Sequence, residues 1–188
     1  MPKVLIPIAT GFEEIEAVNI IDVLRRAGIE VVMASLNAEM LVCGANGITV
    51  QCDRVISGMC ADEVDMIVLP GGWGGTKELA HDATVQALLK EMDAKDKNIG
   101  AICAAPFALY TAGVLKEGYT CYPGVEKEIH VAGYRGDESA VIQTGNIMTS
   151  RGPGTAICFG LAIVKKLVGD EMYNGLRSGL LADFCPNI

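Results

Sequence analysis

The sequence predicts an α/β protein with a mostly parallel sheet and helices on both of its faces. Short apolar runs of strand length alternate with segments of helical periodicity along the chain. A strand, a helix and a second strand already fit within the first 36 residues, which implies a parallel pair joined by a right-handed crossover. Nothing resembling a linker, a repeat or a low-complexity tract interrupts the 188 residues, so we expect one domain over 1–188.

The first strand–helix–strand unit has the clearest sequence pattern. The apolar run 3–9 predicts a strand, and the run 30–36 predicts its parallel partner. Between them a helix is expected, with acidic residues in its first turn, basic residues in its last turn and Gly28 as its stop. Its apolar positions recur at helical spacing and should form the buried face: Ile15, Val18, Ile20, Ile21 and Leu24.

The later elements follow from the same two patterns. We expect a hairpin within 40–56, buried strands at 66–69 and 99–103, and short strands within 119–150. We expect helices at 82–95, 104–113, 155–167 and 170–178.

Composition excludes several classes of function. The net charge of -8 and the pI near 4.7 argue against specific nucleic-acid binding, which needs clustered Lys and Arg. No signal peptide is visible, and the longest uncharged stretch, 99–115, is broken by Gly and Pro, so we expect a cytoplasmic protein without a membrane span. The seven cysteines include no C-x-x-C pair and should be reduced thiols. With only two histidines, neither a metal site nor a cofactor is expected.

Cys103 is the most suggestive residue. It lies between a predicted buried strand and a predicted helix, the setting in which a nucleophile is held out on a sharp turn. The start of the following helix would favour its thiolate form. The alternative is a packed core thiol, because free cysteine is among the most buried residue types. The other cysteines lack this setting and are interpreted as core or incidental thiols: Cys43, Cys52, Cys60, Cys121, Cys158 and Cys185.

Three acidic residues, Glu13, Glu14 and Glu16, open the first predicted helix. Capping and helix-dipole complementarity account for Glu13 and Glu14. Glu16 is adjacent to the apolar stripe, since each residue turns the helix by about 100°. Burial there would raise its pKa and make it a proton donor to a neighbouring sulfur or oxygen.

Two loops at the predicted carboxyl edge of the sheet complete the candidate site. The stretch "PGGWGG" at 70–75 has neither a dinucleotide fingerprint nor a Walker lysine. Its N–H groups at Gly71 and Gly72 could form an oxyanion hole, or the glycines could simply make a tight turn. The stretch "TSRGPGT" at 149–155 begins a helix, and Arg151 within it could hold an anion.

Five blocks together resemble one known family. They are "GFEEIEAV", "VLPGGWGG", "GAICAAP", "TCYPGVE" and "TSRGPGTAICFGLAIV". In order and spacing they resemble the ThiJ/PfpI superfamily, in its Parkinsonism-associated protein deglycase branch, from Lys3 to about Val168. The resemblance implies a flavodoxin-like sandwich and a homodimer. It also implies a reactive cysteine at Cys103, a buried glutamate at Glu16 and oxyanion amides at Gly72 and Ala104.

One position departs from part of the family. Some relatives carry a histidine immediately before the proline that corresponds to Pro123, whereas this chain has Tyr122. The Cys–His pair that a peptidase would use is therefore missing. Tyr122 could still offer its hydroxyl to a bound ligand, as Gly71 could offer its backbone.

These residues predict a cofactor-independent enzyme acting on methylglyoxal, glyoxal or their early glycation adducts. Cys103 would form a hemithioacetal, and Glu16 would move the proton. This makes the expected activity that of a cysteine-dependent glyoxalase or a protein deglycase. The alternative is a redox sensor or chaperone that responds to oxidative stress through a Cys103 sulfinic acid. A cysteine peptidase is the weaker alternative.

Overall fold

The computed structural model describes residues 1–186, and within them seven strands form one sheet in the order β5-β2-β1-β6-β7-β9-β8. These strands are β1 (Lys3–Ile8), β2 (Glu30–Ser35), β5 (Arg54–Val55), β6 (Met66–Leu69), β7 (Asn98–Ile102), β8 (Val141–Thr144) and β9 (Ile147–Ser150). Neighbouring strands are parallel except for the edge pair β8–β9, which is antiparallel. A separate antiparallel ribbon pairs β3 (Leu41–Cys43) with β4 (Thr49–Gln51). The predicted α/β class and mostly parallel sheet are confirmed.

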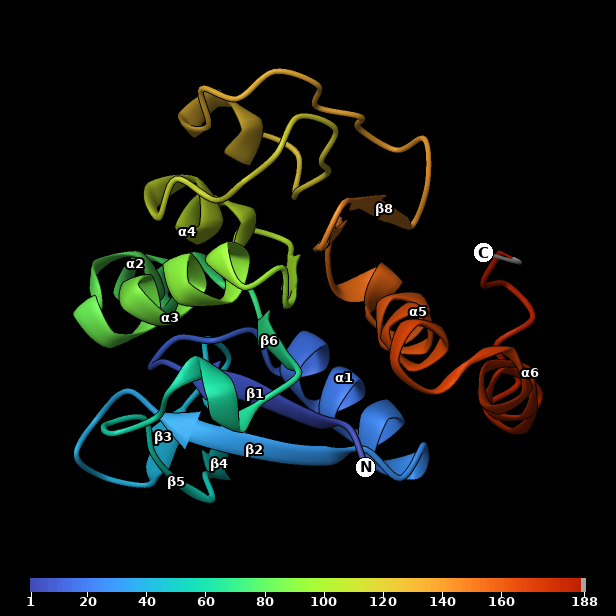
Figure 1. The fold of residues 1–188 in the computed structure, drawn as a ribbon, viewed down its shortest axis with the longest axis horizontal. Coiled ribbons are helices and arrows are strands. Elements are labelled where there is room, and N and C mark those ends of the chain that lie inside the picture. The colour runs from blue at the N-terminus through green and yellow to red at the C-terminus, as the bar shows by residue number, and fades with distance from the viewer. Residues whose placement is uncertain (187–188) are drawn as a thin grey trace.

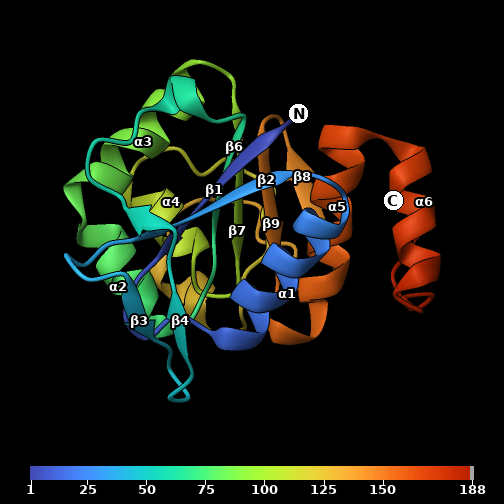
Figure 2. The same cartoon turned by 90° about the horizontal axis from the view of Figure 1, so that it is seen from below.

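Helices cover both faces of the sheet, as predicted. Figures 1 and 2 show α2, α3 and α4 on one face and α1 and α5 on the other, with α6 lying outside α5. The bounds are α1 (Glu14–Arg26), α2 (Trp73–His81), α3 (Ala83–Ala94), α4 (Pro106–Thr111), α5 (Ala156–Val168) and α6 (Asp170–Gly179). Short 3-10 turns lie at Ala61–Glu63, Val125–Glu128 and Pro153–Thr155.

The two helical layers enclose two hydrophobic cores. Successive side chains of a strand point to opposite faces, so in β6 Met66 and Val68 join the core beneath α1 and α5, whereas Ile67 and Leu69 join the core beneath α3 and α4. All four are fully buried. Such continuous apolar strands are expected for a parallel sheet that is covered on both sides.

The orientation of α1 differs from the prediction. Ile15 and Val18, assigned to the buried face, are 53% and 48% exposed, whereas Glu14 and Glu16 are 4% and 0% exposed. The helical spacing located the helix, but two apolar residues remain on its outer face. Glu16 therefore points toward the interior instead of flanking the apolar stripe.

The three acids of the first turn have three different partners. Glu13 caps α1, because its side chain accepts a hydrogen bond from the Glu16 N–H at 2.7 Å. Glu14 instead holds the turn between β3 and β4 and accepts from the Asn46 N–H, the Asn46 side-chain amide and the Ile48 N–H. Burial alone would raise the pKa of Glu14, but these hydrogen bonds outweigh it and hold that pKa below its ordinary value.

One further helix was not predicted from the sequence. Helix α2 occupies a glycine-rich stretch in which no helix was predicted. The short strands expected within 119–150 are confirmed as β8 and β9, and the preceding part of that range has a bridge between Tyr119 and Tyr134 and one 3-10 turn.

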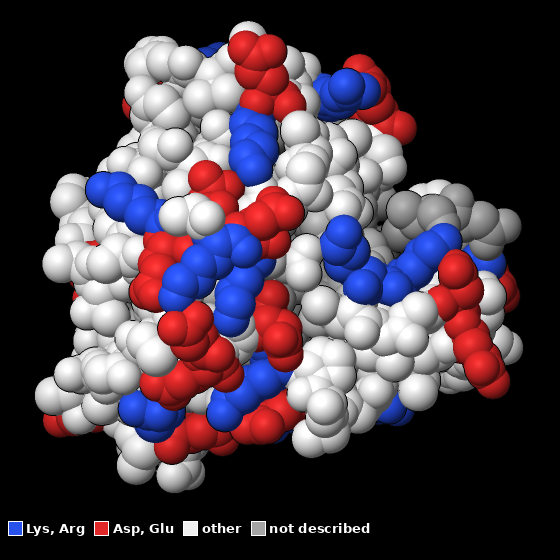
Figure 3. All heavy atoms as spheres, viewed as in Figure 1, with Lys and Arg blue, Asp and Glu red and all other residues white. Residues whose placement is uncertain are grey.

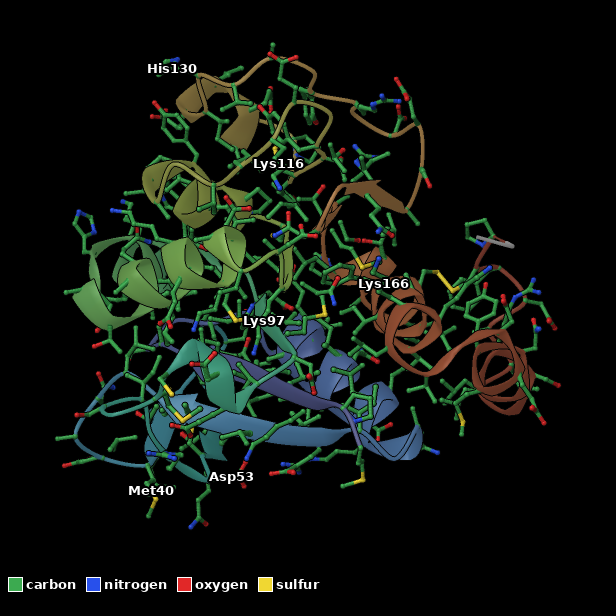
Figure 4. The ribbon with its side chains drawn as sticks, in the orientation of Figure 1. Met40, Asp53, Lys97, Lys116, His130 and Lys166 are labelled. Atoms are coloured by element: carbon green, nitrogen blue, oxygen red, sulfur yellow. A yellow bond between two sulfur atoms is a disulfide. The ribbon has the colours of Figure 1, made fainter. Side chains whose placement is uncertain are left out.

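The cysteines also correct the sequence-based interpretation. Cys158 in α5 and Cys185 after α6 form a disulfide, visible in Figure 4 between α5 and the C-terminal segment, so they are not reduced thiols. Two of the remaining cysteines, Cys43 and Cys60, are exposed and do not belong to the core. Cys52 and Cys121 are buried as expected, and burial raises their pKa values to about 11 and about 12.

The surface in Figure 3 mixes charges of both signs. Acidic and basic side chains interleave across the middle of this face, close to where Figure 4 labels Lys97. Lys95, for example, pairs with both Asp62 and Glu91 at 2.7 Å. Among the helices of residues 1–186, none has the length and apolar character to cross a bilayer.

Candidate active site

Cys103 lies on the sharp turn that the sequence predicts. It follows the last residue of β7 and has φ 64°, a left-handed conformation that residues other than glycine rarely adopt. Two backbone hydrogen bonds fix this turn, from the Cys103 N–H to the Ser150 carbonyl and from the Tyr122 N–H to the Cys103 carbonyl, both at 2.9 Å. The residue is 8% exposed, so little of it is open to solvent. Strained backbone of this kind is concentrated at functional positions.

Glu16 and Cys103 meet at Gly71. A Cβ atom on Gly71 would lie 2.6 Å from both the Cys103 Cβ and the Glu16 Oε2. The Glu16 Oε2 accepts a hydrogen bond from the Gly71 N–H at 2.8 Å, and its carboxyl interacts with the Cys103 thiol. Within residues 1–186, the buried Oε1 has no hydrogen bond of standard geometry. The structure thus brings together the two residues that the sequence nominates.

The glycine turn at Gly71 and Gly72 has two backbone N–H groups with different partners. The N–H groups of Gly72 and Ala104 point at the Cys103 sulfur, and these are the two amides that the family resemblance implies. The suggestion that the Gly71 N–H also forms an oxyanion hole is wrong, because that N–H is donated to Glu16. Gly71 is buried, and its carbonyl accepts from the Glu13 N–H at 2.9 Å, so neither backbone group is available to a ligand.

The electrostatics of the pair favour a shared proton. Burial raises the pKa of Glu16 from 4.5 to about 7, although the Cys103 thiol and the Gly71 N–H act in the opposite direction. Burial, and then the negative charge of Glu16, also raise the pKa of the Cys103 thiol, against the effect of the Gly72 and Ala104 amides. The raised pKa of Glu16 has the direction expected from the sequence, whereas burial and Glu16 oppose the thiolate form of Cys103 that the start of the following helix was expected to favour. A thiolate forms readily only when the proton resides on Glu16.

A pocket of about 260 Å³ lies beside the elbow. Its lining includes Tyr122, Pro123, Arg151 and the 152–155 segment. Tyr122 is 50% exposed and so could meet a ligand, as the sequence suggests. The Arg151 Nε is buried with no hydrogen-bond partner in the described part of the chain, which makes this guanidinium the cationic group of the pocket.

The two histidines have other contacts. The His81 Nδ1 lies 2.7 Å from the Lys77 carbonyl, and the His130 ring packs edge-on against Tyr110. Figure 4 places His130 at the outer edge of the molecule, beyond α4. The Cys103 thiol accordingly has a carboxyl group and not an imidazole as its partner. No group of three or more His, Cys, Asp or Glu side chains within 1–186 is arranged to hold a metal ion.

One supporting contact was not identified from the sequence. The loop before α1 packs directly on the glycine turn, so that the Gly75 N–H donates to the Gly11 carbonyl and the Glu13 N–H donates to the Gly71 carbonyl. These hydrogen bonds fix the position of the first turn of α1, which carries Glu16, relative to Gly72. The glycines at 11, 71, 72 and 75 are the only sequence feature that could have indicated such a close approach.

Comparison with known proteins yields relatives over nearly the whole chain. The DJ-1/PfpI family profile matches residues 2–166. The crystal structure of Drosophila melanogaster DJ-1beta has 37% identity and a TM-score of 0.92, covering 96% of this chain and 97% of that one. Oxidized DJ-1 of Toxoplasma gondii has 39% identity and a TM-score of 0.89, covering 96% and 98%. The glutathione-independent glyoxalase DJR-1.2 of Caenorhabditis elegans is 37% identical over 89% of each chain. The fold, the arrangement of Cys103 and Glu16, and these similarities lead to one conclusion: the chain belongs to the DJ-1/PfpI family.

Proposed function

We propose that this protein is a cofactor-independent glyoxalase that converts methylglyoxal to lactate and glyoxal to glycolate. The observation that carries the proposal is the Cys103 thiol beside a buried Glu16 whose pKa is raised to about 7. A carboxyl group with such a pKa can both accept and return a proton near neutrality. A relative that bears a glyoxalase name supports the choice of reaction.

The first step forms a carbon–sulfur bond. Glu16 takes the thiol proton, and the Cys103 sulfur attacks the aldehyde carbon of the dicarbonyl. The aldehyde oxygen becomes an alkoxide on the carbon that is now bonded to sulfur. The N–H groups of Gly72 and Ala104 point toward that sulfur and stabilise the neighbouring negative charge. Glu16 then returns its proton to that oxygen. The product of this step is a hemithioacetal, and Glu16 is ionised again.

The second step moves hydrogen between the two carbons. Glu16 removes the proton from the former aldehyde carbon and delivers it to the neighbouring carbon, while the hydroxyl proton passes to the second oxygen. One carbon is oxidised as the other is reduced, so no external electron acceptor is needed. The resulting thioester is hydrolysed by water, which frees the Cys103 thiol and the hydroxy acid. Arg151, on the wall of the pocket, suits the carboxylate of that acid.

The same chemistry extends to early glycation adducts. An adduct of methylglyoxal with an amine or a thiol retains the carbonyl and hydroxyl carbons on which the two steps depend. Attack by Cys103 on the hydroxyl-bearing carbon would displace the amine or thiol, which leaves with the proton that Glu16 took from Cys103. This gives the same hemithioacetal, which the second step converts to the thioester. We propose this deglycase activity as a second use of the same site.

The test is lactate formation from methylglyoxal by the wild type and by Cys103→Ser. We expect loss of essentially all turnover in Cys103→Ser, because a serine hydroxyl beside a carboxyl group is a far weaker nucleophile than a thiolate. Cys60→Ser, which removes an exposed thiol, is the matched control and should keep the wild-type rate. Wild-type turnover equal to that of Cys103→Ser would refute the proposal.

The second candidate function is redox sensing through Cys103. The observation in its favour is the unpartnered Glu16 Oε1, which in its protonated form could donate to a sulfinate oxygen. Mass spectrometry after mild peroxide treatment separates the two functions. Addition of two oxygen atoms to Cys103 alone, in a protein that does not turn over methylglyoxal, would favour the sensor.

We also propose that the protein acts as a homodimer. Ile15 and Val18 are exposed on α1, and Ile48, 57% exposed, lies in the hairpin that Glu14 fastens to the same turn of α1. A second copy of this surface would bury these side chains. We expect Val18→Glu to shift the sedimentation coefficient from dimer to monomer. Val168→Glu, at a valine of similar exposure at the end of α5, should leave the dimer intact, and a wild-type monomer would contradict the assignment.

A further inference from the structure

The C-terminal segment is attached to the body of the protein mainly by one covalent link. The Cys158–Cys185 disulfide joins the first turn of α5 to the segment that follows α6, across 27 residues of sequence, with 5.2 Å between the Cα atoms. Of the large apolar side chains of this segment, Leu180 is partly buried and packs against the core, whereas Leu181 and Phe184 are 81% and 65% exposed and add little packing. Besides the disulfide, Ala182 is the buried residue of the segment.

Hydrogen bonds also connect the segment to α6. The Tyr173 hydroxyl donates to the Pro186 carbonyl at 2.8 Å, and the Arg177 guanidinium donates to the Asp183 carbonyl at 3.0 Å. The Ala182 N–H donates to the Arg177 carbonyl, and the Cys185 N–H to the Ala182 carbonyl, both at 2.9 Å. Such bonds are each worth little net free energy near the surface, so the disulfide decides whether the segment stays in place.

The disulfide also lies next to the wall of the active-site pocket. Cys158 is three residues after Thr155, and Thr155 closes the pocket-lining segment through its N–H, which donates to the Gly152 carbonyl at 2.9 Å. Helix α5 packs against α1 on one side and α6 on the other. A change at Cys158 therefore reaches both the C-terminal segment and this wall.

We propose that Cys158 and Cys185 form a redox-sensitive clasp. In the disulfide form the clasp holds residues 180–186 against α5. Its reduction frees this segment and loosens the first turn of α5 beside the pocket. The clasp is separate from Cys103, and the inference does not depend on the proposed glyoxalase activity.

A dithiol can reduce the clasp, and a peroxide can form it again. One thiolate of the dithiol attacks a clasp sulfur and expels the other cysteine as a thiolate; the second thiol of the reductant then displaces the first cysteine. Two cysteine thiols and an oxidised, cyclic reductant result. In the reverse direction, peroxide oxidises one cysteine to a sulfenic acid with release of water, and the other cysteine displaces a second water to form the disulfide.

Burial makes local opening around the disulfide a condition for reduction. Cys158 and Cys185 are 3% and 0% exposed, so a reductant reaches either sulfur only when the residues around the still intact disulfide open locally. Tyr173→Phe removes the hydroxyl that holds Pro186 and should speed reduction by dithiothreitol about two- to tenfold. Tyr110→Phe, on α4, is the matched control and should reduce at the rate of the parent protein.

The experiment compares amide hydrogen exchange in the oxidised and the dithiothreitol-reduced protein. A Cys103→Ser background keeps active-site oxidation out of the measurement. We expect exchange in 180–186 to rise at least about tenfold on reduction, and exchange at Thr155 to rise by a smaller factor. Peroxide should restore both. Cys158→Ser should show the fast exchange without reductant and no further response, whereas Cys60→Ser should respond like the parent.

Two outcomes would overturn the proposal. If reduction leaves exchange in 180–186 within a factor of about two of the oxidised protein, the noncovalent contacts suffice and there is no clasp. If the segment loosens while Thr155 keeps its protection, the part of the proposal that concerns the pocket is wrong. Peptide mapping after peroxide must also find Cys158 linked to Cys185, since any other pairing contradicts the assignment.

Discussion

Glu16→Gln is expected to lower kcat for methylglyoxal at least about a hundredfold, because the amide can neither take the thiol proton nor move hydrogen between the substrate carbons. The fold should survive, since the new side-chain carbonyl can still accept from the Gly71 N–H. Glu13→Gln is the matched control: its side chain keeps an acceptor for the Glu16 N–H, and it should retain turnover within a few-fold. Steady-state kinetics on the three proteins would decide the matter, and a near-normal kcat in Glu16→Gln would remove Glu16 from the mechanism.

The same variant should change how stability depends on pH. The pKa of Glu16 is about 7 in the folded protein against 4.5 for an ordinary glutamate, so between these values the folded chain binds more protons than the unfolded chain. Stability is then full below pH 4.5 and falls as pH rises through 7, by about 3 kcal/mol in all. Glutamine cannot ionise, so Glu16→Gln should lose most of this fall. Urea unfolding at about pH 5 and pH 8 measures it, and an equal fall in both proteins would contradict the raised pKa.

Gly72→Ala is expected to destabilise the protein by about 2 kcal/mol or more and to remove most of its turnover. Gly72 has φ 87°, and a Cβ there would lie 2.5 Å from the Gly11 carbonyl oxygen and 2.7 Å from the Glu13 nitrogen. Both atoms belong to the backbone and cannot rotate away. The turn would have to shift, which would carry the Gly72 N–H away from the Cys103 sulfur.

Gly74→Ala provides the comparison for this substitution. Gly74 lies in the helix that follows the turn, and the nearest atom to its added Cβ is 3.7 Å away. This change should be neutral or slightly stabilising, because alanine is the better helix former. Thermal unfolding of both variants tests the argument, and equal melting temperatures for Gly72→Ala and Gly74→Ala would show that the glycine turn tolerates a side chain.

Local patterns were sufficient for the elements that each carry their own signature. The apolar run before Cys103 and the small residues after it predicted the elbow, and parallel strand order brought Cys103 and Glu16 to the same edge of the sheet. Helix α2 was not predicted because the glycines in its first turn disfavour a helix. Gly75 is required there by packing, since its added Cβ would lie 2.9 Å from the Phe12 nitrogen.

The remaining differences arise from contacts between distant segments. The outward position of Ile15 and Val18 follows from the burial of Glu14 and Glu16, whose partners lie in the hairpin and the glycine turn. The Cys158–Cys185 pair joins residues 27 apart in a chain of seven cysteines, and no spacing rule selects it. The hydrogen bond from the Gly71 N–H to Glu16 was not predicted, because a sequence does not show which acceptor a given N–H will meet.

The position of Glu14 has a consequence for the dynamics of the nucleophile. The first turn of a helix ordinarily frays, because its N–H groups lack partners within the helix. Here fraying of α1 would break the three hydrogen bonds that Glu14 accepts from Asn46 and Ile48, as well as the bond between Glu16 and Gly71. The order of the catalytic carboxyl group therefore depends on a surface hairpin 32 residues further along the chain. Substitutions in that hairpin that remove these hydrogen bonds would increase disorder beside Cys103.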